Sequence, residues 1–270
     1  MRKVYRSEGN KTYWDKRWSG SKTDSRVFED LNIYPIKYAR MILDNKEDKA
    51  LEIGCGLGRV LKHYHYNGYN IFGIERSEVA VKKILVEDGK LNVSVGDVLN
   101  LPYPDSFFDV IMAFGLYHNL ENELLDALKE TVRCLKPGGR FCISMRPNNF
   151  EMWTNEIYWR MKNKQIFKKQ TRFHKLLVSE NEFKTILFSI GLKIRNVYRA
   201  RNMSLLYRMP FLRCGDNKED NEAALRSKGY KLNKLGIFID NGLMKIFPYQ
   251  FCNVLVFVGN KDSKRNNGNK

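Results

Sequence analysis

The chain has 270 residues and a formal net charge of +17 at pH 7. This length suits one large α/β domain or two small ones, and the unbroken order of its motifs favours one. No stretch reaches the roughly 18 apolar residues of a membrane-spanning helix, and the basic N-terminus lacks the apolar run of a signal peptide. Five cysteines without a Cys-x-x-Cys pair exclude a closed disulfide framework and predict a reducing, cytoplasmic location.

Positive charge is concentrated in the second half of the chain. Residues 1–50 carry 12 Lys and Arg against 8 Asp and Glu, residues 51–150 carry 11 against 12, and residues 151–270 carry 24 against 10. The last segment therefore has a net charge of +14. This favours an anionic partner, which is left open as phosphate, nucleic acid or an acidic membrane face, and solubility alone would also account for it.

The first 45 residues precede the main alternation of strands and helices. They include the aromatic and basic cluster Tyr13-Trp14-Asp15-Lys16-Arg17-Trp18, which is too short to form a domain. The apolar spacing after Pro35 predicts an amphipathic helix that begins at Ile36 and ends near Asn45.

The chain is organised around the stretch from Ala50 to Val60, where a short buried strand runs through a glycine-rich turn into a helix over 58–67. Gly54, Gly56 and Gly58 permit positive φ and close approach of a ligand, and the amides of the following helix point at that ligand. A cofactor is therefore expected at this turn. The spacing Gly-x-Gly-x-Gly argues against a nicotinamide dinucleotide, whose fingerprint is Gly-x-Gly-x-x-Gly.

Acidic residues end the next two predicted strands. Strand 70–74 is closed by Glu75, and strand 91–95, which follows a helix over 77–87, is closed by Gly96-Asp97. A carboxylate after the second strand can accept both ribose hydroxyls. One after the third strand can accept the amino group of an adenine, so the pattern predicts a nucleoside-containing cofactor.

The alternation continues to the end of the chain. Strand 107–113, helix 121–135, strand 141–145, helix 180–189 and strands 192–198 and 253–258 follow in order, and Lys136-Pro137-Gly138-Gly139 is expected to end its helix. Alternating strands and helices predict a parallel sheet that is covered on both faces.

Together these motifs resemble the class I S-adenosylmethionine-dependent methyltransferases. The resemblance runs from about Ala50 to Met145 and rests on Leu-Glu-Ile-Gly-Cys-Gly-Leu-Gly-Arg, Gly-Ile-Glu-Arg-Ser, Gly-Asp-Val-Leu-Asn-Leu-Pro-Tyr, Phe-Phe-Asp-Val-Ile and Leu-Lys-Pro-Gly-Gly-Arg-Phe. It implies a Rossmann-like, doubly wound, seven-stranded sheet of order 3-2-1-4-5-7-6 with strand 7 antiparallel. It also implies S-adenosyl-L-methionine as cofactor, bound by a core over residues 46–145.

The resemblance also assigns roles to residues. It implies that Glu52 and the three glycines hold the methionine part of the cofactor, that Glu75 holds the ribose and that Asp97 faces the adenine. Four neighbours are expected to line the cofactor: Cys55, Arg76, Val98 and Phe114. Glu75-Arg76 departs from the family, which often has Asp followed by an apolar residue.

Residues 1–45 are expected, by the same resemblance, to fold over the cofactor as a lid. Tyr13 and Trp14 are the candidates for an aromatic face against the sulfonium, which would stabilise the cation by about 0.5 to 2 kcal/mol. Ordinary packing on the edge of the sheet explains the two side chains equally well.

Two candidates for catalysis follow strand 107–113, at the edge where open α/β sheets bind ligands. His118 suits either a general base toward a hydroxyl acceptor or a side chain that lines the site, and Tyr117 is the secondary candidate. Methyl transfer depends mainly on alignment, so neither is required. His63 and His65 have no carboxylate or cysteine at ligand spacing, and no metal is predicted.

Residues 146–178 and 200–251 are predicted substrate-cap inserts. The first interleaves aromatic and basic residues, which suits a single-stranded nucleic acid, an anionic acceptor or a cap helix with a solvated Lys face. The second holds a predicted amphipathic helix from Asn233 to Phe247, which would cover a lipid-like substrate, rest on an anionic membrane or pack in the core. The tail over 261–270 is predicted to be disordered.

These features predict a single-domain S-adenosylmethionine-dependent methyltransferase that methylates oxygen in a small or lipid-linked anionic acceptor, with a possible peripheral membrane contact. The strand-four loop lacks the Asn/Asp-Pro-Pro-Tyr motif of amino-directed DNA enzymes. Two alternatives stay open: an RNA methyltransferase that uses the basic half of the chain, and a cofactor-binding subunit without turnover.

Overall fold

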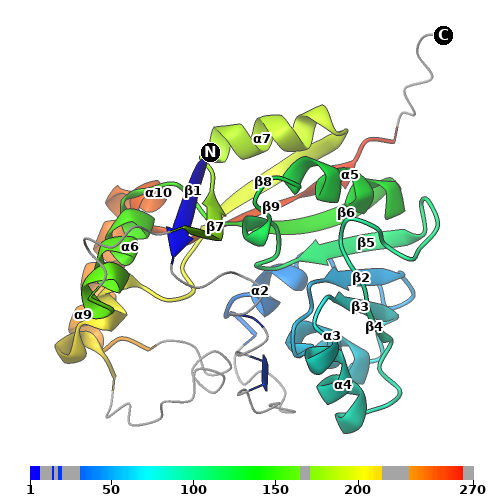
Figure 1. Ribbon diagram of the computed structural model, residues 1–270, viewed down its shortest axis with the longest axis horizontal. Coiled ribbons are helices and arrows are strands. Elements are labelled where there is room, and N and C mark those ends of the chain that lie inside the picture. The colour runs from blue at the N-terminus through cyan, green and yellow to red at the C-terminus, as the bar shows by residue number, and fades with distance from the viewer. Residues whose placement is uncertain (7–13, 15–17, 20–30, 165–170, 215–230, 264–270) are drawn as a thin grey trace.

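A seven-stranded sheet forms the centre of the molecule (Figure 1), and the computed structural model describes residues 1–6, 14, 18–19, 31–164, 171–214 and 231–263. In their order across the sheet the strands are β4 (Val93–Val95), β3 (Ile71–Glu75), β2 (Ala50–Ile53), β5 (Phe108–Ala113), β6 (Leu135–Met145), β9 (Val254–Lys261) and β8 (Leu192–Ala200). β9 is antiparallel to β6 and β8, and the pairs from β4 to β6 are parallel. The predicted Rossmann-like strand order and the antiparallel seventh strand are confirmed.

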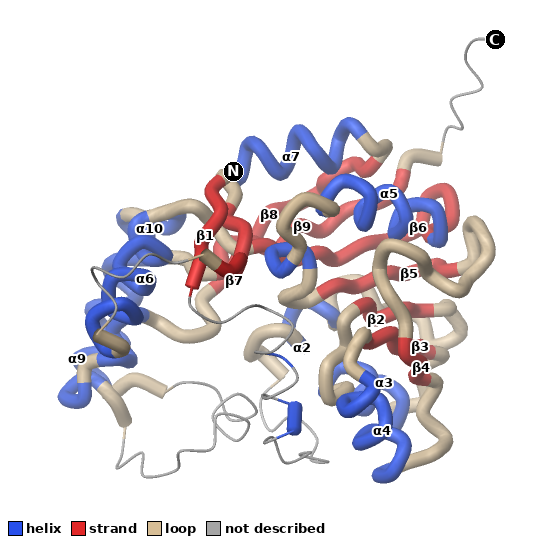
Figure 2. Tube along the Cα trace, viewed as in Figure 1, coloured by secondary structure: helices blue, strands red, loops and turns tan. Residues whose placement is uncertain are grey.

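Helices cover both faces of this sheet (Figure 2). α5 (Leu124–Cys134) and α7 (Glu180–Ser189) pack on one face, and α2 (Ile36–Ala39), α3 (Arg59–Tyr66) and α4 (Glu78–Glu87) on the other. The pleat of β6 supplies both hydrophobic cores, because Phe141 and Ile143 join the first and Cys142 between them joins the second. The sheet is therefore buried on both sides, as predicted.

Several predicted elements have different bounds in the structure. The helix expected from Ile36 to near Asn45 is wrong in length, because α2 ends at Ala39 and a turn carries the buried Ile42 and Leu43. The helix predicted over 121–135 starts at Leu124, and β6 begins directly after it at Leu135. Strand β4 has only three residues, since the chain bends into it from a turn at Leu91.

A second, two-stranded antiparallel sheet was not predicted. It joins β1 (Arg2–Arg6) to β7 (Arg172–Leu177), with Val4 opposite Lys175. Val4 packs with Leu177 and with Met152 of α6 (Phe150–Lys162). The start of the chain is thus fixed to the first insert, and the insert contains a strand as well as the expected helix.

The rest of the inserts lies at one end of the molecule, where Figure 1 shows α6, α9 and α10 together. The second insert contains η2 (Leu205–Arg208), η3 (Pro210–Leu212), α9 (Lys234–Ile246) and α10 (Pro248–Phe251). α9 matches the helix predicted from Asn233 to Phe247. None of the described helices combines the length and the apolar composition that crossing a bilayer requires.

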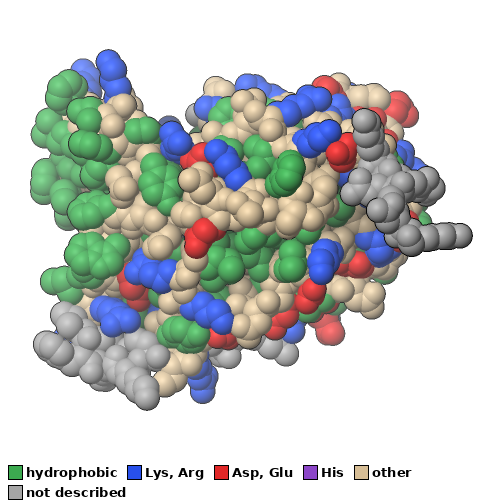
Figure 3. Space-filling model, turned by 90° about the horizontal axis from the view of Figure 1, so that it is seen from above, with side chains coloured by type: hydrophobic (Ala, Val, Ile, Leu, Met, Phe, Trp, Pro, Cys, Tyr) green, Lys and Arg blue, Asp and Glu red, His purple; other side chains and the backbone are tan. Residues whose placement is uncertain are grey.

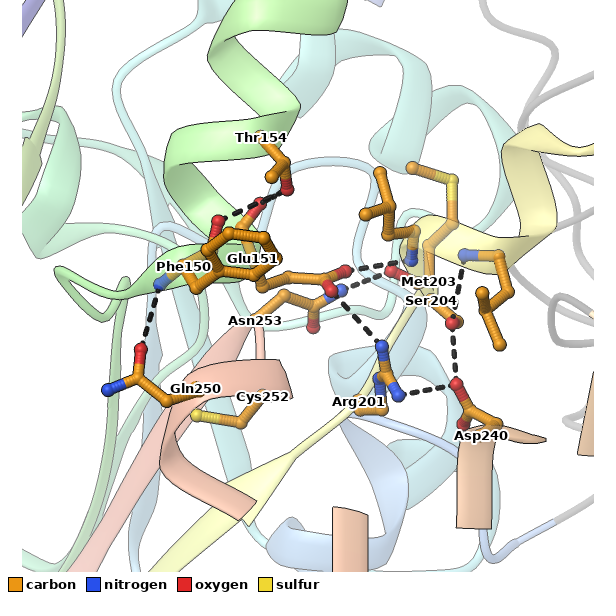
Figure 4. Close-up of polar contacts among 12 residues, drawn as sticks. Phe150, Glu151, Thr154, Arg201, Met203, Ser204, Asp240, Gln250, Cys252 and Asn253 are labelled. Carbon is orange, nitrogen blue, oxygen red and sulfur yellow. Dashed lines mark hydrogen bonds and ion pairs between the residues drawn. The ribbon is translucent and has the colours of Figure 1, made fainter. Parts of the chain in front are cut away.

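A buried polar network ties these inserts to the sheet (Figure 4). Glu151 of α6 is fully buried and accepts hydrogen bonds from Arg201, at 3.1 Å, and from the Leu205 backbone N–H, at 2.7 Å. The Arg201 guanidinium, just after β8, also pairs with Asp240 of α9, which accepts from Ser204 at 2.5 Å. One cation therefore joins α6, α9 and η2.

Replacement of Arg201 by Met should destabilise the protein by about 3 to 5 kcal/mol, because it leaves Glu151 and Asp240 without their cation in a buried site. Chemical denaturation measures the loss. Arg199→Met, at the end of β8 and two residues before Arg201, is the matched control, since Arg199 pairs with Glu180 while 41% exposed, and it should cost less than about 1 kcal/mol. Equal losses in the two variants would contradict this role for the network.

Candidate functional site

The glycine-rich turn after β2 has the backbone geometry that its sequence predicts. Gly54, Gly56 and Gly58 have φ angles of 70°, 57° and 71°, in the left-handed region. A Cβ added at Gly56 would lie 3.0 Å from the indole of Trp18. The turn therefore requires glycine for its conformation and, at Gly56, for the close approach of another group.

Glu75 joins the end of β3 to this turn. Its Oε2 accepts a hydrogen bond from the Gly56 N–H at 2.9 Å, and its Oε1 accepts one from the Ser77 N–H at 3.0 Å. Each carboxylate oxygen can accept a further hydrogen bond. Glu75 is thus held where it can receive the two hydroxyls of a ribose.

Asp97 lies one strand further along the same edge, after β4. Its Oδ1 accepts from the Leu99 N–H at 3.0 Å, and its Oδ2 lies 3.6 Å from Nε of Arg76. The Asp97 side chain is 39% exposed and that of Arg76 is 72% exposed. The structure brings Glu75, Arg76 and Asp97 together at the carboxyl ends of neighbouring strands.

Glu52 is buried beneath the turn rather than open to it. Its Oε2 accepts from the Leu61 N–H of α3 at 2.9 Å, and its side chain is 4% exposed. Burial raises the pKa of this carboxyl to about 8, although the hydrogen bond and the nearby Arg59 act in the opposite direction. Glu52 therefore fixes α3 against the strand, and a cation bound at the turn would favour its charged form.

Three predicted lining residues contribute mainly to packing. The Cys55 thiol is buried, Sγ lies 3.1 Å from the position of a Cβ at Gly73, and burial raises the pKa of the thiol well above its usual value. The Val98 side chain packs in the core with α5. Phe114 is half-buried and meets Tyr34 edge to face at 5.9 Å. The sequence analysis missed Tyr34, whose hydroxyl lies 3.0 Å from Ser144 Oγ at the end of β6.

The aromatic residue that reaches the turn is Trp18, although the candidates were Tyr13 and Trp14. Trp14 stacks on Trp18 with ring centroids 5.3 Å apart, and Lys83 of α4 donates to the Trp18 carbonyl at 2.6 Å. Tyr13 lies outside the described residues. The spacing of four between Trp14 and Trp18 was the signal available in the sequence, because it places two side chains on one face of a helical turn.

The two catalytic candidates point in different directions from the 3₁₀ helix η1 (Tyr117–Asn119). Tyr117 was a wrong choice, because its side chain is fully buried and its hydroxyl lies 2.6 Å from Thr131 of α5. Burial also raises its pKa. His118 lies beside Gly115 at the edge of the sheet, 8% exposed. Burial, with Arg146, Lys175 and His174 nearby, holds the pKa of His118 well below its usual value, so the imidazole is neutral at pH 7.

The residues present fit S-adenosylmethionine. An acidic residue for the ribose, a second carboxylate one strand away and a glycine turn without side chains converge at one edge of the sheet. Glu75 and the glycines would hold the cofactor, with Glu52 supporting the turn from beneath, and the cofactor supplies the methyl group when bound. Among the described residues, no group of three or more His, Cys, Asp and Glu is placed to hold a metal ion.

Comparisons with known proteins decide the family of this segment. Residues 51–143 match the family model described as a methyltransferase domain. The chain contains a class I S-adenosylmethionine-dependent methyltransferase domain. S-adenosyl-L-methionine is accordingly the cofactor of this domain.

The relatives that this domain resembles act on different substrates, by their names. The chain is 31% identical over 103 residues to a 27-O-demethylrifamycin SV methyltransferase of Amycolatopsis mediterranei, covering 36% of this chain and 38% of the relative. It is 34% identical over 101 residues to a tRNA (carboxymethyluridine(34)-5-O)-methyltransferase of Arabidopsis thaliana, covering 35% and 23%. The match thus spans well under half of either relative.

The fold is also that of solved methyltransferases. A SAM-dependent methyltransferase from Archaeoglobus fulgidus superimposes with a TM-score of 0.56 and 18% identity, over 83% of this chain and 90% of that one. At this identity the likeness supports the fold, and the fold alone.

Gly56→Ala should weaken binding of S-adenosylhomocysteine by about tenfold or more, because the added methyl group shifts the turn against Trp18 and Glu75. Titration calorimetry measures the affinity. Gly191→Ala is the control, since Gly191 has a φ of 82° but nothing within 4 Å of the added Cβ. Both variants should lose about 1 kcal/mol of stability from the left-handed φ. NADH, titrated into the unchanged protein, should not bind. Equal S-adenosylhomocysteine affinities in the two variants would show that the turn is not the cofactor site.

Proposed function

We propose that the chain is an active S-adenosylmethionine-dependent methyltransferase that acts at oxygen on a small or lipid-linked anionic acceptor. The observation that carries the proposal is Glu75, whose two oxygens are held toward the glycine turn by backbone N–H groups of Gly56 and Ser77. The match to a methyltransferase domain supports the same activity.

The position of the inserts supports a small acceptor. Arg146, at the carboxyl end of β6, donates a 2.8 Å hydrogen bond to the carbonyl of Asn253, which lies between the second insert and β9. His118 lies in η1, which follows β5 and contacts β7, and β7 pairs with β1. These elements cover the edge of the sheet where the cofactor lies, so an acceptor must enter between them.

The residues of this chain act by alignment more than by chemistry. Holding an acceptor oxygen in line with the methyl group and its leaving sulfur can lower the barrier by roughly 7 to 11 kcal/mol. Neutral His118 can accept a proton, but its lowered pKa makes it a weak base. We therefore propose that His118 mainly lines the acceptor site.

The nature of the acceptor can be tested with tritium-labelled S-adenosylmethionine and cell extract. Purified protein should transfer label into a low-mass or lipid fraction that binds to an anion exchanger, and Glu75→Ala should transfer none, because it cannot hold the ribose. Label found only in macromolecular RNA would support the RNA alternative instead, and binding to RNA should then weaken steeply with salt. The absence of label from every fraction would contradict the proposal that the protein is an active enzyme.

A second observation concerns the outer surface of the inserts. Figure 3 shows hydrophobic side chains gathered at the end of the molecule where α6, α9 and α10 lie. The most exposed include Trp153 at 50%, Met161 at 59%, Phe211 at 69%, Phe238 at 74%, Ile246 at 67% and Phe247 at 54%. Basic residues of the same helices border them, including Arg160, Lys162, Lys234 and Lys245.

We propose that this apolar face rests on an anionic membrane. Exposed aromatic and aliphatic side chains beside Lys and Arg are typical of helices that lie in the interface of acidic bilayers. Such an orientation would place the acceptor site beside a lipid surface, which suits a lipid-linked acceptor.

Protein should float with vesicles that contain phosphatidylserine and much less with vesicles of phosphatidylcholine alone. Phe238→Glu combined with Phe247→Glu should abolish flotation, because a charge cannot enter the acyl boundary, while S-adenosylhomocysteine binding stays unchanged. Undiminished flotation of the double variant would contradict the proposal. A protein that sediments as a dimer, and that the double variant makes monomeric, would show that a second copy covers the face instead.

A further inference from the structure

Basic side chains gather where the first insert meets the carboxyl edge of the large sheet. We name as the cation cluster the basic residues Arg6 of β1, Arg146 after β6, Lys175 of β7 and Arg208 of η2, together with two neutral histidines beside them, His118 of η1 and His174 of β7. The members act on one another electrostatically: Arg146, Lys175 and His174 lower the pKa of His118, and Arg6, Arg146 and Arg208 lower that of Lys175. Segments from across the chain therefore converge on one positive site.

The pairing of β1 with β7 orients part of this cluster. Lys175 is directly opposite Val4, and the side chains of such a pair share one face of the sheet. Val4 packs on Met152 of α6, so Lys175 lies on the face toward α6. Arg6 follows on the same strand, where its guanidinium lies 4.0 Å from the Trp159 ring centroid and pairs with Glu156 at 2.9 Å.

Negative charge near the cluster is already engaged. The Glu156 carboxylate pairs with Arg6 at 2.9 Å and lies 3.6 Å from Nε of Arg160. Burial lowers the pKa of Lys175 to about 7, with Arg6 and Arg146 acting in the same direction and Glu156 opposing them. The described Glu156 carboxylate is therefore already engaged by two guanidinium groups.

A second observation points to a ligand. Nδ1 of His118 is buried and has no hydrogen-bond partner within the described part of the protein, and the side chain is only 8% exposed. Nε of Arg208 is likewise buried without a described hydrogen-bond partner, although its guanidinium lies 4.3 Å from the Tyr158 ring centroid. Several buried side-chain atoms of the described residues lack a hydrogen-bond partner, and these two lie beside the cation cluster, where a ligand would supply one.

We propose that the cation cluster binds an oxyanion group, phosphate or carboxylate, of the methyl acceptor, with Lys175 and Arg208 as its main contacts. Lys175 supplies a point charge and Arg208 a planar fork, the two donor types that recognise such groups. The assignment rests on the proposed function, since it takes the neighbouring site for that of the acceptor. It adds a defined binding site and names its residues.

The geometry favours a discrete headgroup over an extended polyanion. Arg6 has a side chain that is 14% exposed, and Arg146, Lys175 and Arg208 are half-buried. Phosphates along a nucleic acid backbone are contacted by exposed Lys and Arg, spread over a surface. A cluster folded in between β7, α6 and η2 suits one anionic group that ends a molecule.

The test uses the full-length protein with inorganic phosphate and with succinate as probes, at an ionic strength held constant with chloride. Calorimetry should show saturable binding of at least one probe. Lys175→Met and Arg208→Met should each weaken it about tenfold or more, because a charge-assisted hydrogen bond is lost. Lys193→Met is the control, since Lys193 is an exposed residue of β8 paired with Asp262, and it should bind as the unchanged protein does.

A thermal readout separates a ligand site from a structural one. Without any probe, Lys175→Met should melt at a higher temperature than the unchanged protein, because it relieves repulsion from Arg6 and Arg146. Stabilisation by the probe should be lost in the same variant. Preference for phosphate or for succinate identifies the headgroup, and either result supports the site.

Absence of saturable binding by both probes, or unchanged binding in Lys175→Met, would overturn the proposal. S-adenosylhomocysteine is titrated into every variant to separate this outcome from failure of the proposed function. If S-adenosylhomocysteine binds and the probes do not, the anion site alone is wrong. If S-adenosylhomocysteine does not bind the unchanged protein, the proposed methyltransferase is wrong.

Discussion

The hydrogen bond from the Gly56 N–H to the Glu75 carboxylate is the contact on which the cofactor site depends. It closes the glycine turn, which follows β2, against the end of β3. The carboxyl ends of these two parallel strands are thereby held side by side. The left-handed φ angles of Gly54, Gly56 and Gly58 make that closure possible, and Glu52 holds α3 from beneath. One carboxylate thereby shapes the turn and remains available to a ribose.

A second constraint is the way in which the inserts are anchored. Much of the apolar surface of the inserts is exposed or packed within the inserts rather than against the sheet, so specific polar contacts hold them to it. Arg201 supplies one anchor through Glu151 and Asp240, and the pairing of β1 with β7 supplies another. Both anchors lie near the carboxyl edge of the sheet, because the chain enters and leaves the inserts there.

The sequence predicted the central sheet and its order because those elements carry strong local patterns of apolar runs, glycines and terminal carboxylates. It did not predict β1 or β7, whose basic residues show no period and whose partners lie about 170 positions apart along the chain. Tyr117 was misplaced for another reason: neighbours in a 3₁₀ helix point in different directions, so adjacency to His118 says nothing about a shared site. Trp18 required the tertiary contact with Gly56. Local pattern finds the cofactor site, and packing between distant segments determines the acceptor site.

The distribution of charge gives the cofactor site and the cation cluster opposite preferences for the charge of a ligand. Residues 51–150 carry 11 basic and 12 acidic residues, and the cofactor that this segment holds bears a cationic sulfonium. The cation cluster lies around His118, where residues of the inserts contribute part of the positive charge. A neutral acceptor would gain nothing from that cluster, whereas an acceptor with one anionic group would be held by it and attracted toward the sulfonium at the same time. The cluster would fix only the charged end of such a molecule. Its reactive oxygen would then have to lie at a set distance from that end, and the distance between the cluster and the glycine turn would determine the length of the acceptor.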